Sequence, residues 1–401
     1  MERPRVVVLD HTAQAGGAEL ALLRLLEQLG QEAVDPRAIV FAHGPFVRRL
    51  RGSGVTTAVV ELDEAVNETD RSTAFGAANL IASAVAALSF LPRLVRAIRG
   101  ARADLVVANS LKSAVFAAVA APLAFRPWVW HLHDRLATDY LPPRAVRILR
   151  ALSVIGPRRI VVNSRATLET LPARARAKAV VAYPGLPAEA YRPVTPPDVR
   201  TVGIIGRISP TKGQREFLQA SALVATDAPD VRFRVVGAAI FGEDDYEAAV
   251  RRLPHELGIA DRVEFTGWVD DPGAELRRLT VLVHASPVPE PFGQVVAEAL
   301  AAGVPVVAAD AGGVPEILGA ASRGADGVGW CDTGVGWLVR PGDPAALASA
   351  MRDALDAPVA DTERQARIRS AGERFSIEAT AGLVSRTWLD ALSRPRRGRI
   401  R

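Results

Sequence analysis

Two glutamates, Glu290 and Glu298, stand eight positions apart in the stretch EPFGQVVAEAL, where an apolar segment passes into a helical pattern. Pro291 suits the first position of a helix and Gly303 suits its C-terminal cap, so the free backbone N–H groups near Phe292 form an anion site. The second glutamate then lies about two turns, roughly 10 Å, further along the axis. Because carboxylates are strong acceptors for sugar hydroxyls, the pair predicts a phosphate flanked by hydroxyl-rich rings, as in a nucleotide-sugar. The alternative is a surface helix with two solvated glutamates.

The elements that must position this pair alternate along almost the whole chain. Short apolar runs are separated by helical patterns, which predicts βαβ units and parallel sheets with covered faces. Proline concentrates in residues 184–198, the best linker in the chain, and each side of it opens with a strand, a glycine-bearing turn and a helix. The strand candidates are 5–10, 37–42, 104–109, 127–133, 159–164, 201–208, 233–238, 263–268, 281–286 and 304–309.

Two α/β domains in tandem are the simplest account of this series. A chain of 401 residues exceeds the size at which single cores usually stop growing. In doubly wound sheets ligands bind at the carboxyl ends of the strands, which in both halves would face a shared cleft. The dinucleotide fingerprint G-x-G-x-x-G is absent from both opening turns, and this disfavours a nicotinamide or flavin dehydrogenase.

The composition limits the possible partners. The net charge is +5, but only three of the 49 basic residues are lysines, which indicates a compositional bias rather than a nucleic-acid surface. The single cysteine, Cys331, excludes an internal disulfide, and neither it nor the six histidines have metal-ligand spacing. The N-terminal apolar run is too short for a signal peptide and ends in Asp10, so we expect a cytoplasmic protein.

Two segments raise the question of a membrane. Residues 74–91 carry no charge, and the tail 394–401 is rich in arginine. The alanine-rich composition of the first segment favours a helix with one apolar face over a membrane span, with interfacial contact as the alternative. The tail is interpreted as a chain end, with anionic lipid contact as its alternative.

The glutamate pair, embedded in E-P-F-G between a strand and a helix, resembles the signature of the retaining GT-B-fold glycosyltransferases of the group-one family (family four). The resemblance covers nearly the whole chain and implies an α/β fold with two Rossmann-like, doubly wound parallel-sheet domains facing a cleft. Residues 1–190 would form the acceptor-side domain, completed by a crossing C-terminal helix within 376–401, and residues 191–375 would bind the nucleotide-sugar. Two places depart from the family: Pro184-Gly185 replaces the usual Asn-Gly, and residues 319–333 are extended.

The resemblance also implies roles for single residues. Glu290 would contact the donor sugar and Glu298 the ribose, while Arg207 and Lys212 in GRISPTKG would neutralise the diphosphate. In the N-terminal half, His133 in WHLHDR would lie near the reacting centre, and His131 is interpreted as a packed residue. We therefore expect His133, Glu290, Arg207 and Lys212 as catalytic residues, and Gly16, Gly17, Arg207, Lys212, Glu290, Phe292, Gly293, Gln294, Val295, Glu298, Gly312, Gly313 and Glu316 as donor-binding residues.

The activity that follows is transfer of a sugar from a nucleotide diphosphate to an acceptor hydroxyl, with retention at the anomeric carbon. No metal or other cofactor is expected, because D-x-D does not occur in the chain and cations with a helix terminus can carry the diphosphate. The expected partners are the nucleotide-sugar, a glycan, lipid-linked or small-molecule acceptor, and peripherally the inner face of a membrane, without nucleic acid. A nucleotide-sugar epimerase of the same fold and a catalytically silent donor-binding protein remain as alternatives.

Overall fold

The computed structural model describes residues 3–14, 16–29, 34–63, 77–195, 197–240, 242–319, 329–357 and 360–393, and for residues 77–88 it describes the backbone alone. The arginine-rich tail 394–401, most of the extension 319–333 and the side chains of most of the uncharged segment 74–91 therefore lie outside the described residues.

The chain folds into two compact units. Unit 1 comprises Met1–Gly185 and Ile377–Arg401, and unit 2 comprises Leu186–Ser376. The sequence placed the boundary five residues later, after residue 190, and assigned the last helix to the first domain.

Unit 1 is built on a seven-stranded parallel sheet with the strand order β3-β2-β1-β4-β5-β6-β7. Its strands are β1 (Arg5–Asp10), β2 (Asp35–Val40), β3 (Thr56–Val59), β4 (Leu105–Ala108), β5 (Trp128–Leu132), β6 (Arg159–Val162) and β7 (Ala179–Val181). Its helices are α1 (Gly17–Leu29), α2 (Pro45–Gly52), α4 (Ala77–Gly100), α5 (Leu111–Leu123), α6 (Pro143–Ile155), α7 (Arg165–Glu169), α8 (Ala173–Arg176) and α16 (Ile377–Leu392).

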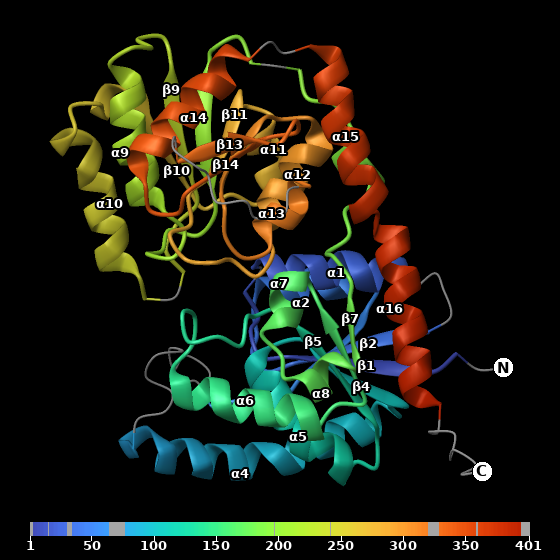
Figure 1. Ribbon diagram of the computed structural model, residues 1–401. Coiled ribbons are helices and arrows are strands. Elements are labelled where there is room, and N and C mark those ends of the chain that lie inside the picture. The colour runs from blue at the N-terminus through green and yellow to red at the C-terminus, as the bar shows by residue number, and fades with distance from the viewer. Residues whose placement is uncertain are drawn as a thin grey trace. The chain divides into compact units, whose positions relative to one another are not determined.

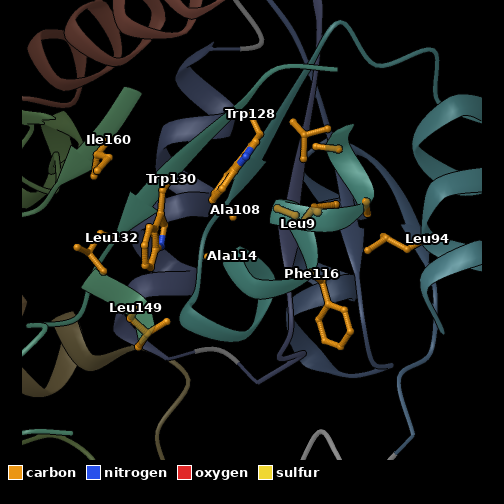
Figure 2. Packing of buried hydrophobic residues seen from close by; sticks show 14 of the residues in the cluster. Leu9, Leu94, Ala108, Ala114, Phe116, Trp128, Trp130, Leu132, Leu149 and Ile160 are labelled. Atoms are coloured by element: carbon orange, nitrogen blue, oxygen red, sulfur yellow. The ribbon is translucent and has the colours of Figure 1, made fainter. Parts of the chain in front are cut away.

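Helices cover both faces of this sheet (Figure 1). Successive strand side chains point to opposite faces, so Val7 and Leu9 of β1 join α4, α5 and α6 in one core, whereas Val6 and Val8 join α1, α2 and α16 in the other. Figure 2 shows the first of these cores, in which the indole of Trp130 packs among aliphatic side chains. Burial on both faces explains why the strands are continuous apolar runs rather than alternating ones.

Unit 2 repeats the topology in the order β10-β9-β8-β11-β12-β14-β13, and its strands are parallel except for β13, which is antiparallel to β14. Its strands are β8 (Thr201–Ile205), β9 (Arg232–Val236), β10 (Val263–Gly267), β11 (Val281–His284), β12 (Val306–Ala309), β13 (Trp330–Asp332) and β14 (Trp337–Val339). Its helices are α9 (Gln214–Ala225), α10 (Asp244–Glu256), α11 (Pro272–Leu276), α12 (Gln294–Ala302), α13 (Val314–Ile317), α14 (Pro344–Asp356) and α15 (Asp361–Phe375), with 3₁₀ turns η1 (Ala188–Tyr191) and η2 (Ala260–Arg262).

The predicted α/β class with parallel sheets is confirmed, and each of the ten strand candidates overlaps a strand of the structure. Four strands were missed: β3, β7, β13 and β14. Each has only three or four residues, and β3, β7 and β13 lie at the edges of their sheets, where partial exposure weakens the apolar signal.

Candidate functional site

The switch point of the unit 2 sheet, between β8 and β11, brings two of the predicted residues together. Lys212 follows β8 and Glu290 follows β11, and the Lys212 Nζ forms an ion pair with Oε1 of Glu290. The order of a doubly wound sheet reverses at this point, which leaves a crevice at the strand ends where ligands bind. Two residues 78 positions apart in the sequence thus meet where the fold favours a ligand.

Glu290 is held by groups that stabilise its charge. Nε2 of His284 contacts Oε2 of the carboxylate, and the Ser286 hydroxyl lies 3.3 Å from the same oxygen. Burial by itself would raise the pKa of Glu290, but the charge of Lys212 and the His284 imidazole outweigh it and hold the pKa well below its ordinary value. Glu290 is therefore an ionised acceptor at neutral pH.

Two glycines permit the close packing of backbone around this carboxylate. Gly213 has φ +80°, and a Cβ there would lie 2.0 Å from the carbonyl oxygen of Ala285. Gly312 has φ +65°, and its Cβ would lie 2.0 Å from the carbonyl oxygen of Glu290. The neighbouring Gly313 donates its backbone N–H to that oxygen at 2.9 Å. The predicted glycine turn therefore positions Glu290 directly, through its backbone.

Helix α12 begins at Gln294, three residues after the predicted start at Pro291, and the segment that carries Glu290 leads directly into its N-terminus. The predicted start was wrong because the backbone of Gly293 is left-handed, a conformation that an α-helix does not include. Gly293 is the N-cap residue with φ +102°, and Gly303 caps the C-terminus with φ +77°. The Phe292 side chain is buried against the ring of Phe375, at 5.7 Å between centroids, so only its backbone remains for a ligand. The other donor-binding candidates here, Gln294, Val295 and Glu298, are half-buried.

Arg207 and Glu316 have contacts that the sequence did not indicate. Nη1 of Arg207 lies 2.5 Å from Oε2 of Glu243, the N-cap residue of α10, so a phosphate would compete with that carboxylate. Glu316 lies on the four-residue helix α13, and its backbone carbonyl accepts a hydrogen bond from Nη1 of Arg374 at 2.7 Å.

In unit 1, His133 belongs to a hydrogen-bonded chain across the sheet's own switch point. The Asn109 Nδ2 donates to the Asp10 carboxylate at 2.7 Å, and the His133 Nε2 lies 2.9 Å from Oδ1 of Asn109. Because the amide oxygen can only accept, the His133 Nε2 carries the proton and Nδ1 is left as an acceptor. Burial lowers the pKa of His133 against the opposing charges of Asp134 and Asp10, which favours this neutral form.

The neighbouring histidine has a structural role. His131 is buried, and its Nε2 accepts a hydrogen bond from the Trp388 Nε1 at 2.9 Å, which ties β5 to α16. Burial, with a smaller contribution from the charge of His133, lowers the pKa of His131 to about 3. Gly16 and Gly17 stand at the start of α1, where the Leu20 N–H donates to the Gly16 carbonyl at 3.0 Å.

Four polar residues at these sites were given no sharp role from the sequence: Asp10, Asn109, Glu243 and His284. Asn109 lay at the end of the strand candidate 104–109, and His284 lay within the strand candidate 281–286. The available signal was position, since Asp10, Asn109 and His284 end or directly follow strands beside a switch point.

Within the described residues, no group of three histidine, cysteine or carboxylate side chains is arranged to hold a metal ion. No helix in that part of the chain is long and apolar enough to cross a membrane.

Comparison with known families matches both units. Residues 189–375 match the model for glycosyl transferases group 1, and residues 16–185 match that for the glycosyl transferase 4-like domain. The chain belongs to the glycosyltransferase group 1 family. The predicted resemblance is thereby confirmed.

Individual members of the family are similar over much of the chain. The D-inositol 3-phosphate glycosyltransferase of Streptomyces scabiei is 29% identical over 287 residues, which cover 66% of this chain and 61% of that protein. The 2-deoxystreptamine glucosyltransferase of Streptomyces kanamyceticus is 35% identical over 187 residues, 46% of this chain and 43% of the relative. The chain thus spans less than two thirds of the length of these curated relatives.

A solved structure extends the similarity to almost the whole chain. The crystal structure of Anabaena HepE in complex with UDP-glucose has a TM-score of 0.78 and 27% sequence identity, and covers 96% of this chain and 99% of that one. Sucrose-phosphate synthase from Thermosynechococcus elongatus, with a TM-score of 0.74 and 20% identity, shares the fold.

Proposed function

We propose that this protein transfers a sugar from a nucleoside-diphosphate sugar to an acceptor hydroxyl, with retention of configuration at the anomeric carbon. The observation that carries the proposal is the Lys212–Glu290 ion pair beside the N-terminus of α12 at the switch point of unit 2. A helix terminus and a lysine are suited to a diphosphate, and an ionised glutamate is suited to sugar hydroxyls. Family membership and the UDP-glucose bound to HepE support the same donor class.

Donor binding would exchange partners within this site. In the free protein Lys212 pairs with Glu290, and a diphosphate would attract the Lys212 ammonium away from it. His284 would then remain as the hydrogen-bond donor that orients Glu290 toward the sugar. Lys212, Arg207 and the α12 backbone would stabilise the charge that grows on the departing diphosphate.

We propose front-face attack for the chemical step. The acceptor oxygen bonds to the anomeric carbon on the side that the phosphate leaves, and the leaving phosphate oxygen takes the acceptor proton. The protein orients the reactants and stabilises charge, without an enzymic nucleophile. In unit 1, the contact with Asn109 leaves Nδ1 of His133 as an acceptor, which would suit a hydrogen bond from a sugar hydroxyl.

Thermal shift with a panel of nucleoside diphosphates and their sugars tests the donor class, because a ligand that binds only the folded state raises its stability. We expect UDP or another diphosphate to raise the melting temperature in wild type, and Lys212→Met to lose the shift. NMR of the product should show the anomeric configuration of the donor. Turnover of donor without any acceptor would favour the epimerase, and binding without turnover would favour the silent binding protein.

We also propose that no divalent cation carries the diphosphate, since Lys212, Arg207 and the start of α12 supply positive charge there. Activity should survive excess EDTA. Complete loss that only Mg²⁺ or Mn²⁺ restores would contradict this.

The sequence also predicted membrane contact through residues 74–91 and the tail 394–401. Because most of the side chains in these segments lie outside the described residues, this contact stays a prediction.

A further inference from the structure

Three neighbouring helices of unit 1 have an unusual charge composition. Helices α4, α5 and α6 contain no acidic residue, although 44 of the chain's 401 residues are Asp or Glu. They pack side by side on one face of the sheet, with α5 in contact with both neighbours (Figure 1). We call these three helices the basic layer. Their basic residues are Arg93, Arg96, Arg99, Lys112, Arg144, Arg147 and Arg150.

The outer side of the middle helix α5 is apolar. Val115, Val119 and Leu123, spaced by four, form one line along the helix and are 47%, 45% and 53% exposed. Helix α6 adds Ile148 and Ile155, which are 54% and 82% exposed. Together with Phe125, these make up six of the ten large hydrophobic residues that are prominently exposed in the described part of the chain. Such a concentration of exposed apolar side chains marks an interaction surface.

Phe125, just after α5, is held in a conformation that exposes its ring. The residue is 85% exposed and has φ +58°, a left-handed backbone that is strained for a bulky side chain. Arg99 of α4 supports it, with its guanidinium 5.9 Å from the ring centroid and Nη2 donating to the Leu123 carbonyl at 2.6 Å. The contacts within unit 1 therefore present the ring to the exterior instead of burying it.

The two helices that flank α5 carry exposed cations. These are Arg93 and Arg96 on α4, where Nη2 of Arg93 donates to the Glu61 carbonyl at 3.0 Å, and Arg144 and Arg147 on α6. Apolar side chains between arginines match a lipid interface, where the apolar groups enter the acyl boundary and the guanidinium groups meet lipid phosphates. A nucleic acid would use the arginines and leave the apolar strip exposed to water.

We propose that the outer face of the basic layer is a docking surface for an anionic lipid bilayer. The surface lies on other residues than the donor site, and the proposal goes beyond sugar transfer and does not depend on it. Its main residues, on α5, α6 and the end of α4, are also distinct from the uncharged N-terminal part of α4 and from the tail.

Vesicle flotation tests the proposal with the full-length protein and without donor or acceptor, so the result is independent of the proposed activity. We expect flotation with phosphatidylglycerol vesicles at low salt, weaker flotation at high salt, and little with phosphatidylcholine alone. Val119→Ser combined with Leu123→Ser and Phe125→Ser should reduce vesicle affinity about tenfold or more. Arg93→Glu with Arg147→Glu should also reduce it at least tenfold, since each surface cation contributes roughly fivefold.

Matched controls lie in unit 2. Leu223 is 43% exposed on α9 and Arg252 is exposed on α10, so Leu223→Ser with Arg252→Glu makes similar changes elsewhere and should leave flotation unchanged. A second measurement uses tryptophan quenching by brominated lipids. The quenching that Leu123→Trp adds over wild type should be clear, and the quenching that Leu223→Trp adds should be negligible.

Several results would overturn the proposal. The proposal would be wrong if the wild-type protein did not float with phosphatidylglycerol vesicles. It would also be wrong if the variants of the basic layer floated like wild type while deletion of residues 394–401 abolished vesicle binding. Loss of a dimer in the layer variants, without a change in vesicle affinity, would show instead that this face joins two copies of the chain.

Discussion

At the scale of single residues, Glu290 and Glu298 have different surroundings, so we expect their removal to impair different properties of the enzyme. Glu290 precedes α12 and contacts Lys212 and His284, whereas Glu298 lies on α12 itself. A hydrogen bond to a charged group contributes about 1.5–3 kcal/mol, so removal of either glutamate should lower the rate or the affinity by about ten- to over a hundredfold. Glu290→Ala should mainly lower kcat, because contacts to the sugar tighten as positive charge develops at the anomeric carbon. Glu298→Ala should weaken the bare nucleoside diphosphate, since its ribose is present in substrate and product alike.

Calorimetric binding of the diphosphate to both variants, beside steady-state kinetics, measures this contrast. Glu316→Ala serves as a comparison, because it removes a third glutamate of the donor motifs on a different helix. Equal loss of nucleotide affinity in Glu290→Ala and Glu298→Ala, or no loss in either, would show that the pair is misassigned.

His284 is a positioning residue that the sequence did not single out. It is 6% exposed, contacts Glu290 through Nε2, and has a buried Nδ1 without a hydrogen-bond partner in the described residues. Because an ionised carboxylate can only accept, the His284 Nε2 is the donor in its contact with Glu290.

Two amide substitutions test that role, because glutamine can place a donor near the Nε2 position and asparagine is too short to reach it. We expect His284→Asn to lower kcat at least tenfold with a small change in KM for the donor, and His284→Gln to recover part of the loss. Equal activities of the two variants, or a loss confined to thermal stability, would assign His284 to packing alone.

At the scale of elements, the loop between β8 and α9 depends on Gly213. An alanine at a positive φ costs about 1–2 kcal/mol from backbone strain. At Gly213 the added Cβ would also overlap the Ala285 carbonyl, and overpacking costs about a further 1–3 kcal/mol. Relief of that overlap would move Lys212 away from Glu290, so Gly213→Ala should lower both the melting temperature and the affinity for the diphosphate.

Gly258, after α10, is the control because it has φ +70° but no atom within 4 Å of an added Cβ. Gly258→Ala should show the strain cost alone and keep nucleotide affinity. A Gly213→Ala variant that binds the diphosphate as tightly as Gly258→Ala would contradict the positioning of Lys212 by this turn. Melting temperatures and calorimetry on the two variants decide between these outcomes.

At the scale of the whole molecule, the last helix of the chain folds with the first unit. α16 packs on α1, and Trp388 is buried with its Nε1 bound to His131 on β5. Because burial lowers the pKa of His131 to about 3, against about 6.5 when unfolded, the unfolded chain takes up the proton first as the pH falls. The free energy of unfolding therefore falls as the pH drops below about 6.5, and His131 accounts for a loss of about 2 kcal/mol at pH 5.

His131→Gln tests the linkage, since its amide oxygen can still accept from Trp388 but does not titrate. The difference in unfolding free energy between pH 7.5 and pH 5 should be about 2 kcal/mol smaller in the variant than in wild type. Pulse proteolysis in urea, read from peptides of unit 1, measures that difference. His133 contributes in the same direction to both proteins, so it cancels. An unchanged pH dependence would show that His131 is not neutral and buried in the folded state.

Much of the fold was predictable because its signals are local. Helix α12 illustrates this: a preceding apolar strand and Gly303 at the C-cap lie within one short segment, although the start of the helix was predicted three residues too early, at Pro291. The turns around Gly213 and Gly312 were recognisable for the same reason, since a positive φ restricts which residue a position tolerates. Short edge strands such as β3 were missed because pairing with a neighbour, rather than their own residues, makes them strands.

The sequence by itself determined the α/β class, the family and the segments that carry charge and glycine, since periodicity, caps and turn residues act over a few positions. Only the tertiary structure decided which of these segments meet. Lys212 pairs with Glu290 and Asn109 with Asp10 because the strand order reverses between β8 and β11 and between β1 and β4. The exposure of Val119 and Phe125 was decided in the same way, because an apolar residue is buried or exposed according to which helices pack beside its own. Strand order and helix packing arise from contacts between residues far apart in the chain, and no local pattern encodes them.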